Sequence, residues 1–74
     1  MFKKLKLQRS INKCKKQIEV IEQKRARSQA KLVEAILTHT TPEDDDVDYF
    51  NRYTNQIEDV RRKMHEYEAQ LNNM

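Results

Sequence analysis

The sequence predicts an all-α protein, an antiparallel two-helix coiled-coil hairpin that forms a single domain over residues 1–74. The chain contains no glycine and one proline, Pro42, so almost every position is compatible with a helix and one position favours a break. Apolar residues alternate at spacings of three and four on both sides of Pro42, as at the a and d positions of a coiled coil. Residues 1–37 carry 11 basic and 3 acidic side chains and residues 38–74 carry 4 and 9, which favours pairing of the two halves.

The first helix is expected at about residues 6–38. Its seam follows alternating spacings of four and three and consists of Leu7, Ile11, Cys14, Ile18, Ile21, Arg25, Ser28, Leu32 and Ala35. Arg25 and Ser28 form a polar layer in this seam. We expect the Arg25 side chain to extend to the surface and pair with Glu22 or with an acid of the second helix. A polar contact with a partner is the alternative, because polar seam residues also fix register or partner number.

The break is expected between residues 38 and 42, with a loop at residues 39–41. Proline disfavours helical geometry in the residue before it and is well tolerated at the first position of a helix. We therefore expect Thr41 to act as the N-cap and the second helix to begin at Pro42. Acidic residues follow in the first turn, where they complement the positive end of the helix dipole.

The second helix is expected at residues 42–72. Its seam consists of Phe50, Tyr53, Ile57, Val60, Met64, Tyr67, Leu71 and Met74. A short loop between helices makes them antiparallel neighbours. In that register Leu32 and Ala35 lie near Phe50 and Tyr53, Ile21 lies opposite Val60 and Met64, and Ile11 lies near Leu71 and Met74.

No catalytic, cofactor-binding or metal-binding residues are predicted, and we expect no enzyme activity and no small-molecule substrate. A chain this short buries too little surface to enclose a pocket. Asp44, Asp46 and Asp48 match the first positions of a calcium loop, but Tyr49 and Asn55 replace its glycine and glutamate. His39, His65 and Cys14 lack zinc-site spacing. A lone cysteine forms no internal disulfide and the basic start precedes no apolar signal segment, so a cytoplasmic location is expected.

Several apolar residues lie outside both seams, near the predicted loop. They are Val33, Ile36, Leu37, Val47 and Tyr49. Two helices alone do not cover all of these, and an exposed group of this kind is typical of a docking surface. The partner is expected to be another protein or a second copy of the chain, the latter giving a homodimeric four-helix bundle. The alternative is a local cap packed over the loop.

A basic ridge lies on the outer side of the first helix and consists of Lys6, Arg9, Lys13 and Lys16. Such a ridge is compatible with nucleic-acid phosphates or with an acidic protein surface. Phe2 and Leu5 form an apolar patch too small for stable membrane anchoring. The favoured function is a non-catalytic protein–protein interaction module, namely an adaptor, a small chaperone or a regulator of a partner protein. The alternative is a dimeric RNA- or DNA-binding protein that uses the basic ridge.

Overall fold

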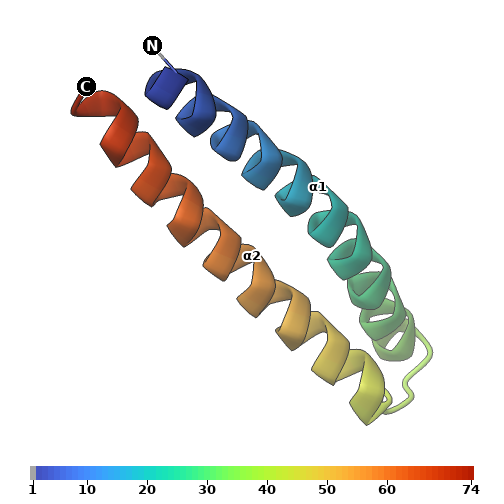
Figure 1. Cartoon of the computed structure of the whole chain (residues 1–74). Coiled ribbons are helices and arrows are strands. Elements are labelled where there is room, and N and C mark those ends of the chain that lie inside the picture. Colours follow the sequence, from blue (N-terminus) through green and yellow to red (C-terminus); the bar gives the residue numbers. More distant parts are fainter. Residues whose placement is uncertain (1) are drawn as a thin grey trace.

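The protein is a helical hairpin of two long antiparallel helices, α1 (Phe2–Leu37) and α2 (Asp44–Asn72) (Figure 1). The computed structural model describes residues 2–74. The two chain ends lie at the same end of the hairpin, and residues 38–43 connect the helices at the other end. The predicted all-α hairpin is confirmed.

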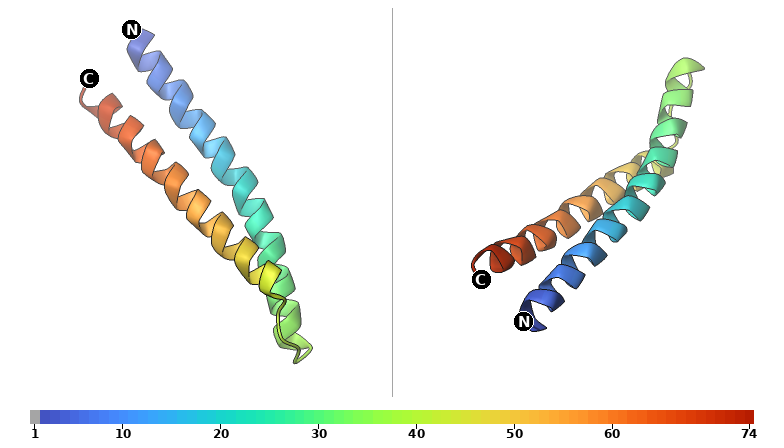
Figure 2. Two further views of the ribbon diagram at one scale, coloured as in Figure 1. Left: turned by 60° about the horizontal axis from the view of Figure 1, so that its bottom comes forward. Right: turned by 90° about the horizontal axis from the view of Figure 1, so that it is seen from above.

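The hairpin is a thin rod whose principal extents are 57 × 15 × 14 Å. The helices remain side by side in the further views of Figure 2. A rod only two helices thick has a core of one layer, because each helix buries a single stripe against the other. Every other side chain is available to solvent or to a partner.

The core consists of the two predicted seams. Its buried residues are Leu7, Ile11, Cys14, Ile18 and Ser28 of α1 and Ile57 of α2. The remaining seam residues are half-buried, except Met74, which is 56% exposed because α2 ends two residues earlier at Asn72. Ile57 is the most completely buried side chain, with 1% of its surface exposed. Burial of an isoleucine contributes about 1.5–3 kcal/mol to stability.

The antiparallel register agrees with the predicted one at the points that contacts define. Ile21 and Val60 line one hollow between the helices, and Ile11 and Leu71 line another. Within residues 2–74, two ion pairs connect the helices: Arg61 Nη2 lies 3.3 Å from Glu22 Oε1, and Lys31 Nζ lies 3.7 Å from Asp46 Oδ1. Exposed pairs of this kind contribute only a few tenths of a kcal/mol each, roughly, so they orient the helices more than they stabilise them.

Helix α1 ends in a Schellman turn at residues 38–40. The Thr40 amide donates to the Ala35 carbonyl at 2.8 Å, and the His39 amide donates to the Ile36 carbonyl at 3.2 Å. His39 has a φ of 56°, the left-handed conformation that this turn requires and that glycine usually supplies. The Thr38 hydroxyl donates to the Glu34 carbonyl at 2.9 Å, so the last turn of α1 is held by side chains as well.

The start of α2 differs from the predicted one. The N-cap is Glu43, with extended backbone angles of −67° and 141°, and the helix begins at Asp44, so the assignments of Thr41 as N-cap and Pro42 as first helical residue are wrong. After the Schellman turn the chain must still cross to the neighbouring axis, about 8–10 Å away. Extended residues of about 3.3 Å each supply that distance, so residues 41–43 remain outside the helix.

The start of α1 also differs, because the helix begins at Phe2 rather than near residue 6. The predicted start was placed near residue 6 because Leu7 is the first residue of the seam. Residues 3–6 contain lysine and leucine, which favour helix, and no breaker precedes them. The helix therefore extends one turn beyond its packed stripe.

The polar layer in the α1 seam is accommodated within α1. The buried Ser28 hydroxyl donates to the Lys24 carbonyl of its own helix at 3.5 Å. Arg25 is half-buried, and no buried side-chain nitrogen or oxygen within residues 2–74 lacks a hydrogen-bond partner, so its guanidinium nitrogens reach solvent, as predicted. The expected ion pair of Arg25, with Glu22 or with an acid of the second helix, is not formed in that part of the chain, and Glu22 pairs with Arg61 instead.

Candidate interaction surfaces

The five apolar residues predicted to dock a partner are all exposed at the loop end of the hairpin. Their exposed fractions are 46% for Val33, 67% for Ile36, 75% for Leu37, 37% for Val47 and 46% for Tyr49. The alternative of a local cap over the loop is therefore wrong, because each of these side chains keeps more than a third of its surface exposed within residues 2–74. The structure leaves apolar surface there in contact with water.

These residues share one end of the hairpin but not one face. Tyr49 and Lys31 line the same hollow on one flank. Val47 is two residues from Tyr49, about 200° around α2, and Ile36 is five residues from Lys31, about 140° around α1. Ile36 and Val47 therefore lie on the flank opposite Tyr49, with Val33 beside Ile36 at i,i+3 spacing.

Tyr49 lies in a polar and aromatic setting. Its ring stacks on that of Tyr53, with centroids 6.2 Å apart and an interplanar angle of 17°. The Arg52 guanidinium carbon lies 5.7 Å from the Tyr49 ring centroid, a cation–π arrangement. The hollow beside these rings is also lined by Lys24, Arg27, Ser28, Lys31 and Asp46.

The basic ridge is exposed and is longer than predicted. Lys6, Arg9, Lys13 and Lys16 are all exposed on α1. After Val20, at the next position of the same stripe, the series continues through Lys24, Arg27 and Lys31, which are also exposed. Spacings of three and four residues keep all of these on one side of a helix. The signal was present in the sequence, but the apolar Val20 interrupted it.

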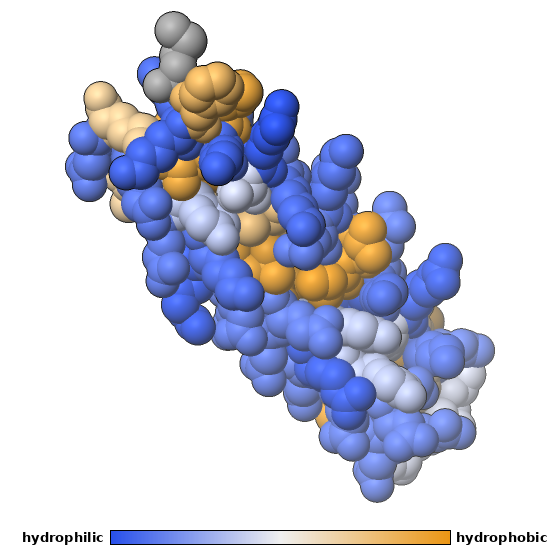
Figure 3. Space-filling model, in the orientation of Figure 1, coloured by the Kyte–Doolittle hydropathy of each residue, from blue (hydrophilic) through white to orange (hydrophobic). Residues whose placement is uncertain are grey.

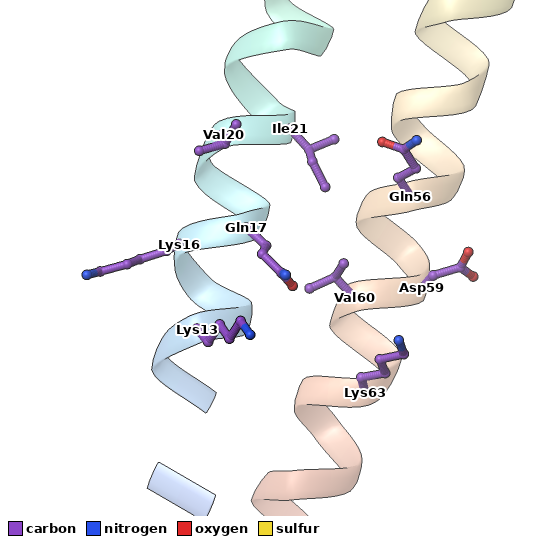
Figure 4. Close-up of a pocket in the computed structure, with 9 residues that line it drawn as sticks. All are labelled: Lys13, Lys16, Gln17, Val20, Ile21, Gln56, Asp59, Val60 and Lys63. Carbon is purple, nitrogen blue, oxygen red and sulfur yellow. The ribbon is translucent and has the colours of Figure 1, made fainter. Parts of the chain in front are cut away.

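A basic groove lies between the helices at mid-length, on the same flank as Tyr49 and Lys31. It has a volume of about 560 Å³ and is lined by Lys13, Lys16, Gln17, Val20, Ile21, Gln56, Asp59, Val60 and Lys63. In Figure 4, Ile21 and Val60 point toward one another across it, whereas Lys16 and Asp59 point outward on opposite rims. Figure 3 shows an apolar area, in orange, at mid-length of the hairpin and bordered by blue hydrophilic side chains.

The groove was not predicted from the sequence. Ile21 and Val60 were assigned to the seam, yet each is only half-buried because the two helices leave one flank of the seam open. Val20 is 52% exposed and adds an apolar side chain beside them. An apolar residue next to a seam position was the available signal, since it widens the stripe beyond what one facing helix covers.

The potential ligand side chains do not assemble into a metal-binding group within residues 2–74. Asp46 points to Lys31 and retains 19% exposure of its side chain. Cys14 is buried in the seam as a free thiol. In the same part of the chain, neither helix combines the length and the apolar character needed to span a membrane.

No protein-family model matches the chain, and no curated protein or solved structure shows significant similarity to it.

Proposed function

We propose that this chain is a non-catalytic protein-interaction module that acts as an adaptor, a small chaperone or a regulator of a partner protein. The observation that carries the proposal is apolar surface beyond what the hairpin needs for its own core. The seams are packed, yet Val20, Val33, Ile36 and Leu37 are between 46% and 75% exposed. Binding a protein would remove such surface from water, with a gain of about 25 cal/mol per Å² of apolar area.

The shape of the hairpin also supports a binding role. Two packed helices present their outer side chains along a rod 57 Å long. Surfaces on rigid helices lose little conformational entropy on binding, so more of the contact energy remains as affinity. One flank offers the basic groove and the opposite flank offers Val33, Ile36 and Val47.

The proposal is tested by identifying and then reconstituting a complex. The full chain is used to recover proteins from an extract of its native host, and each candidate identified by mass spectrometry is purified and titrated against the hairpin by calorimetry. We expect a stoichiometric complex that Ile36→Glu or Val20→Asp weakens at least about tenfold, since burial of one such side chain is worth about that factor. Asn12→Glu, at an exposed position outside both surfaces, should have no effect.

Two results would contradict the proposal. In one, no recovered protein binds when purified. In the other, both surface variants bind with wild-type affinity, which shows that neither apolar surface takes part.

A second candidate function, nucleic-acid binding, is favoured by the exposed ridge that extends from Lys6 to Lys31. At 1.5 Å per residue these 25 steps span about 37 Å, close to one turn of duplex DNA. Phosphate binding weakens steeply with salt, because each neutralised phosphate contributes a slope of about −0.9 in a plot of log K against log salt. Titration with generic duplex DNA and RNA at several salt concentrations separates this function from protein binding, whose apolar contacts depend little on salt.

A further inference from the structure

We propose that the basic groove binds an acidic amphipathic helix of a partner protein, so that hairpin and partner form a three-helix bundle. This inference rests on the proposed interaction function and specifies the chemistry of the partner. The groove runs between α1 and α2. A third helix is the element whose shape fits a groove between two helices packed side by side.

The floor of the groove selects an apolar stripe on the occupant. Ile21 and Val60 face one another across it and Val20 adds a side chain that is 52% exposed. These residues come from both helices, so a ligand that covers them must lie between α1 and α2. An apolar face with residues at i, i+3, i+4 and i+7 is the form in which a helix fills such a groove.

The rims of the groove select acidic side chains beside that stripe. Lys13 of α1 and Lys63 of α2 border the apolar floor, and Lys16 points outward on the α1 rim. The one acid of this lining, Asp59, already pairs with Arg62, whose Nη1 lies 3.3 Å from Asp59 Oδ1. None of the three lysines forms an ion pair within residues 2–74, so their charge is left for a ligand.

The second hollow on the same flank extends this pattern toward the loop. It places Lys24, Arg27 and Lys31 beside Tyr49 and Tyr53. Of these three cations Lys31 alone pairs with an acid of residues 2–74, namely Asp46, and its side chain is still 67% exposed. A bound helix of several turns would therefore contact apolar or aromatic side chains below it and basic side chains beside it along much of its length.

An acidic protein helix fits better than a nucleic acid or a second copy of this chain. A phosphate backbone would pair with the lysines but would leave Val20, Ile21 and Val60 uncovered. A second copy would present α1, whose basic ridge repels the rims, or the outer face of α2, where Arg52 and Arg62 stand among the acids. Opposite charge across an interface determines partner choice, and like charge excludes wrong partners.

The test uses two synthetic helical peptides and the full-length hairpin. One peptide has about four heptads with Ile at a, Leu at d and Glu at e and g, and the other has Lys in place of Glu. Each is labelled with fluorescein and titrated with the hairpin while fluorescence anisotropy is recorded. We expect the Glu peptide to bind and the Lys peptide to bind at least about tenfold more weakly, because charge complementarity favours one and repulsion opposes the other.

Variants locate the binding site. Val20→Asp and Lys63→Glu should each weaken binding of the Glu peptide at least about fivefold to tenfold, whereas Asn12→Glu should leave it unchanged. All three positions are exposed, and thermal unfolding followed by circular dichroism confirms that each variant folds.

Absence of binding by the Glu peptide, equal binding of both peptides, or binding indifferent to Val20→Asp would each overturn the groove proposal. Duplex RNA or DNA that displaces the Glu peptide and binds equally well to Val20→Asp would overturn it in favour of a phosphate-binding surface. Failure of the groove is distinguishable from failure of the interaction function. A reconstituted natural complex that Ile36→Glu weakens while Val20→Asp does not would leave the function intact and place the contact at the loop end.

Discussion

The link between the two helices contains a residue with a left-handed backbone, His39, at a φ of 56°. Histidine tolerates this region better than most residues, but a side chain with a Cβ still incurs a steric cost there that glycine avoids. The amides of His39 and Thr40 satisfy carbonyls at the end of α1, so the turn is retained despite that cost.

We expect His39→Gly to raise the free energy of unfolding by about 0.5–1 kcal/mol, because relief of the left-handed strain exceeds the added flexibility of the unfolded chain. The measurement is urea unfolding followed by circular dichroism. The matched control is His65→Gly, at an exposed right-handed position inside α2, which should lower stability by about 1 kcal/mol. Equal effects of the two substitutions would show that His39 is not strained.

The ion-pair partners of individual side chains could not be predicted from the sequence. The sequence predicted Arg25 as a partner of Glu22. In the structure Glu22 pairs with Arg61 instead, at 3.3 Å. Exposed pairs differ by only a few tenths of a kcal/mol, roughly, so a pattern of charges does not rank them. The outward extension of Arg25 was predictable because a buried unpaired guanidinium is costly.

At the scale of elements, the seams were predictable because burial of a periodic apolar stripe dominates the energy of a helix pair. All seam residues from Leu7 to Leu71 are buried or half-buried. The helix boundaries were less predictable. Pro42 is compatible with both a helical first position and an extended linker, and the distance between the two axes, which the sequence does not contain, selected the linker.

The seam assignment yields a prediction about stability. Ile18→Asp or Ile57→Asp should abolish cooperative unfolding, because each places an unpaired charge at a position only 9% or 1% exposed, at a cost of several kcal/mol. A domain of this size has a total stability of only about 4–11 kcal/mol. Circular dichroism melts provide the measurement. Lys16→Asp, on the exposed side of α1, should melt like the wild type, and equal melts for all three variants would refute the seam.

The candidate surfaces were predictable within each helix but not between the two helices. The position of a residue on its own helix follows from the helical period, so the exposure of Val33, Ile36 and Leu37 was expected and is observed. Whether residues of α1 and residues of α2 form one surface depends on the flank of the hairpin on which each residue lies. The helical period places Val47 and Tyr49 on opposite sides of α2, but only the packing of the hairpin shows that Tyr49 shares a flank with Lys31.

At the scale of the whole molecule, the hairpin has two different long flanks. One carries the basic groove, with Lys13 and Lys63 beside Val20 and Val60. The other carries the ion pair between Glu22 and Arg61 and, near the loop, the apolar residues Val33, Ile36 and Val47. A rod with two unlike flanks can bind two chains at once, so self-association through one flank would leave the other free for a different protein.

Self-association is expected through the loop end of the second flank, which carries Val33, Ile36 and Val47. Small domains without disulfides or metals often gain stability by association, because one layer of core leaves much apolar surface in water. Val33, Ile36 and Val47 are 46%, 67% and 37% exposed, and two hairpins related by a two-fold axis would bury them against each other. We expect a dimer at micromolar concentration.

Sedimentation equilibrium measures this directly, with a wild-type mass twice the chain mass of 9.0 kDa. Val47→Glu and Ile36→Glu should each shift the equilibrium to monomer, because a charge buried in the interface lacks a partner. Tyr49→Glu introduces the same charge on the same turn of α2 but on the opposite flank, and it should leave the dimer intact. A wild-type monomer would refute self-association and leave the surface for a different protein. A dimer that Tyr49→Glu disrupts and Val47→Glu does not would place the interface on the flank of the basic groove, in direct competition with the acidic helix.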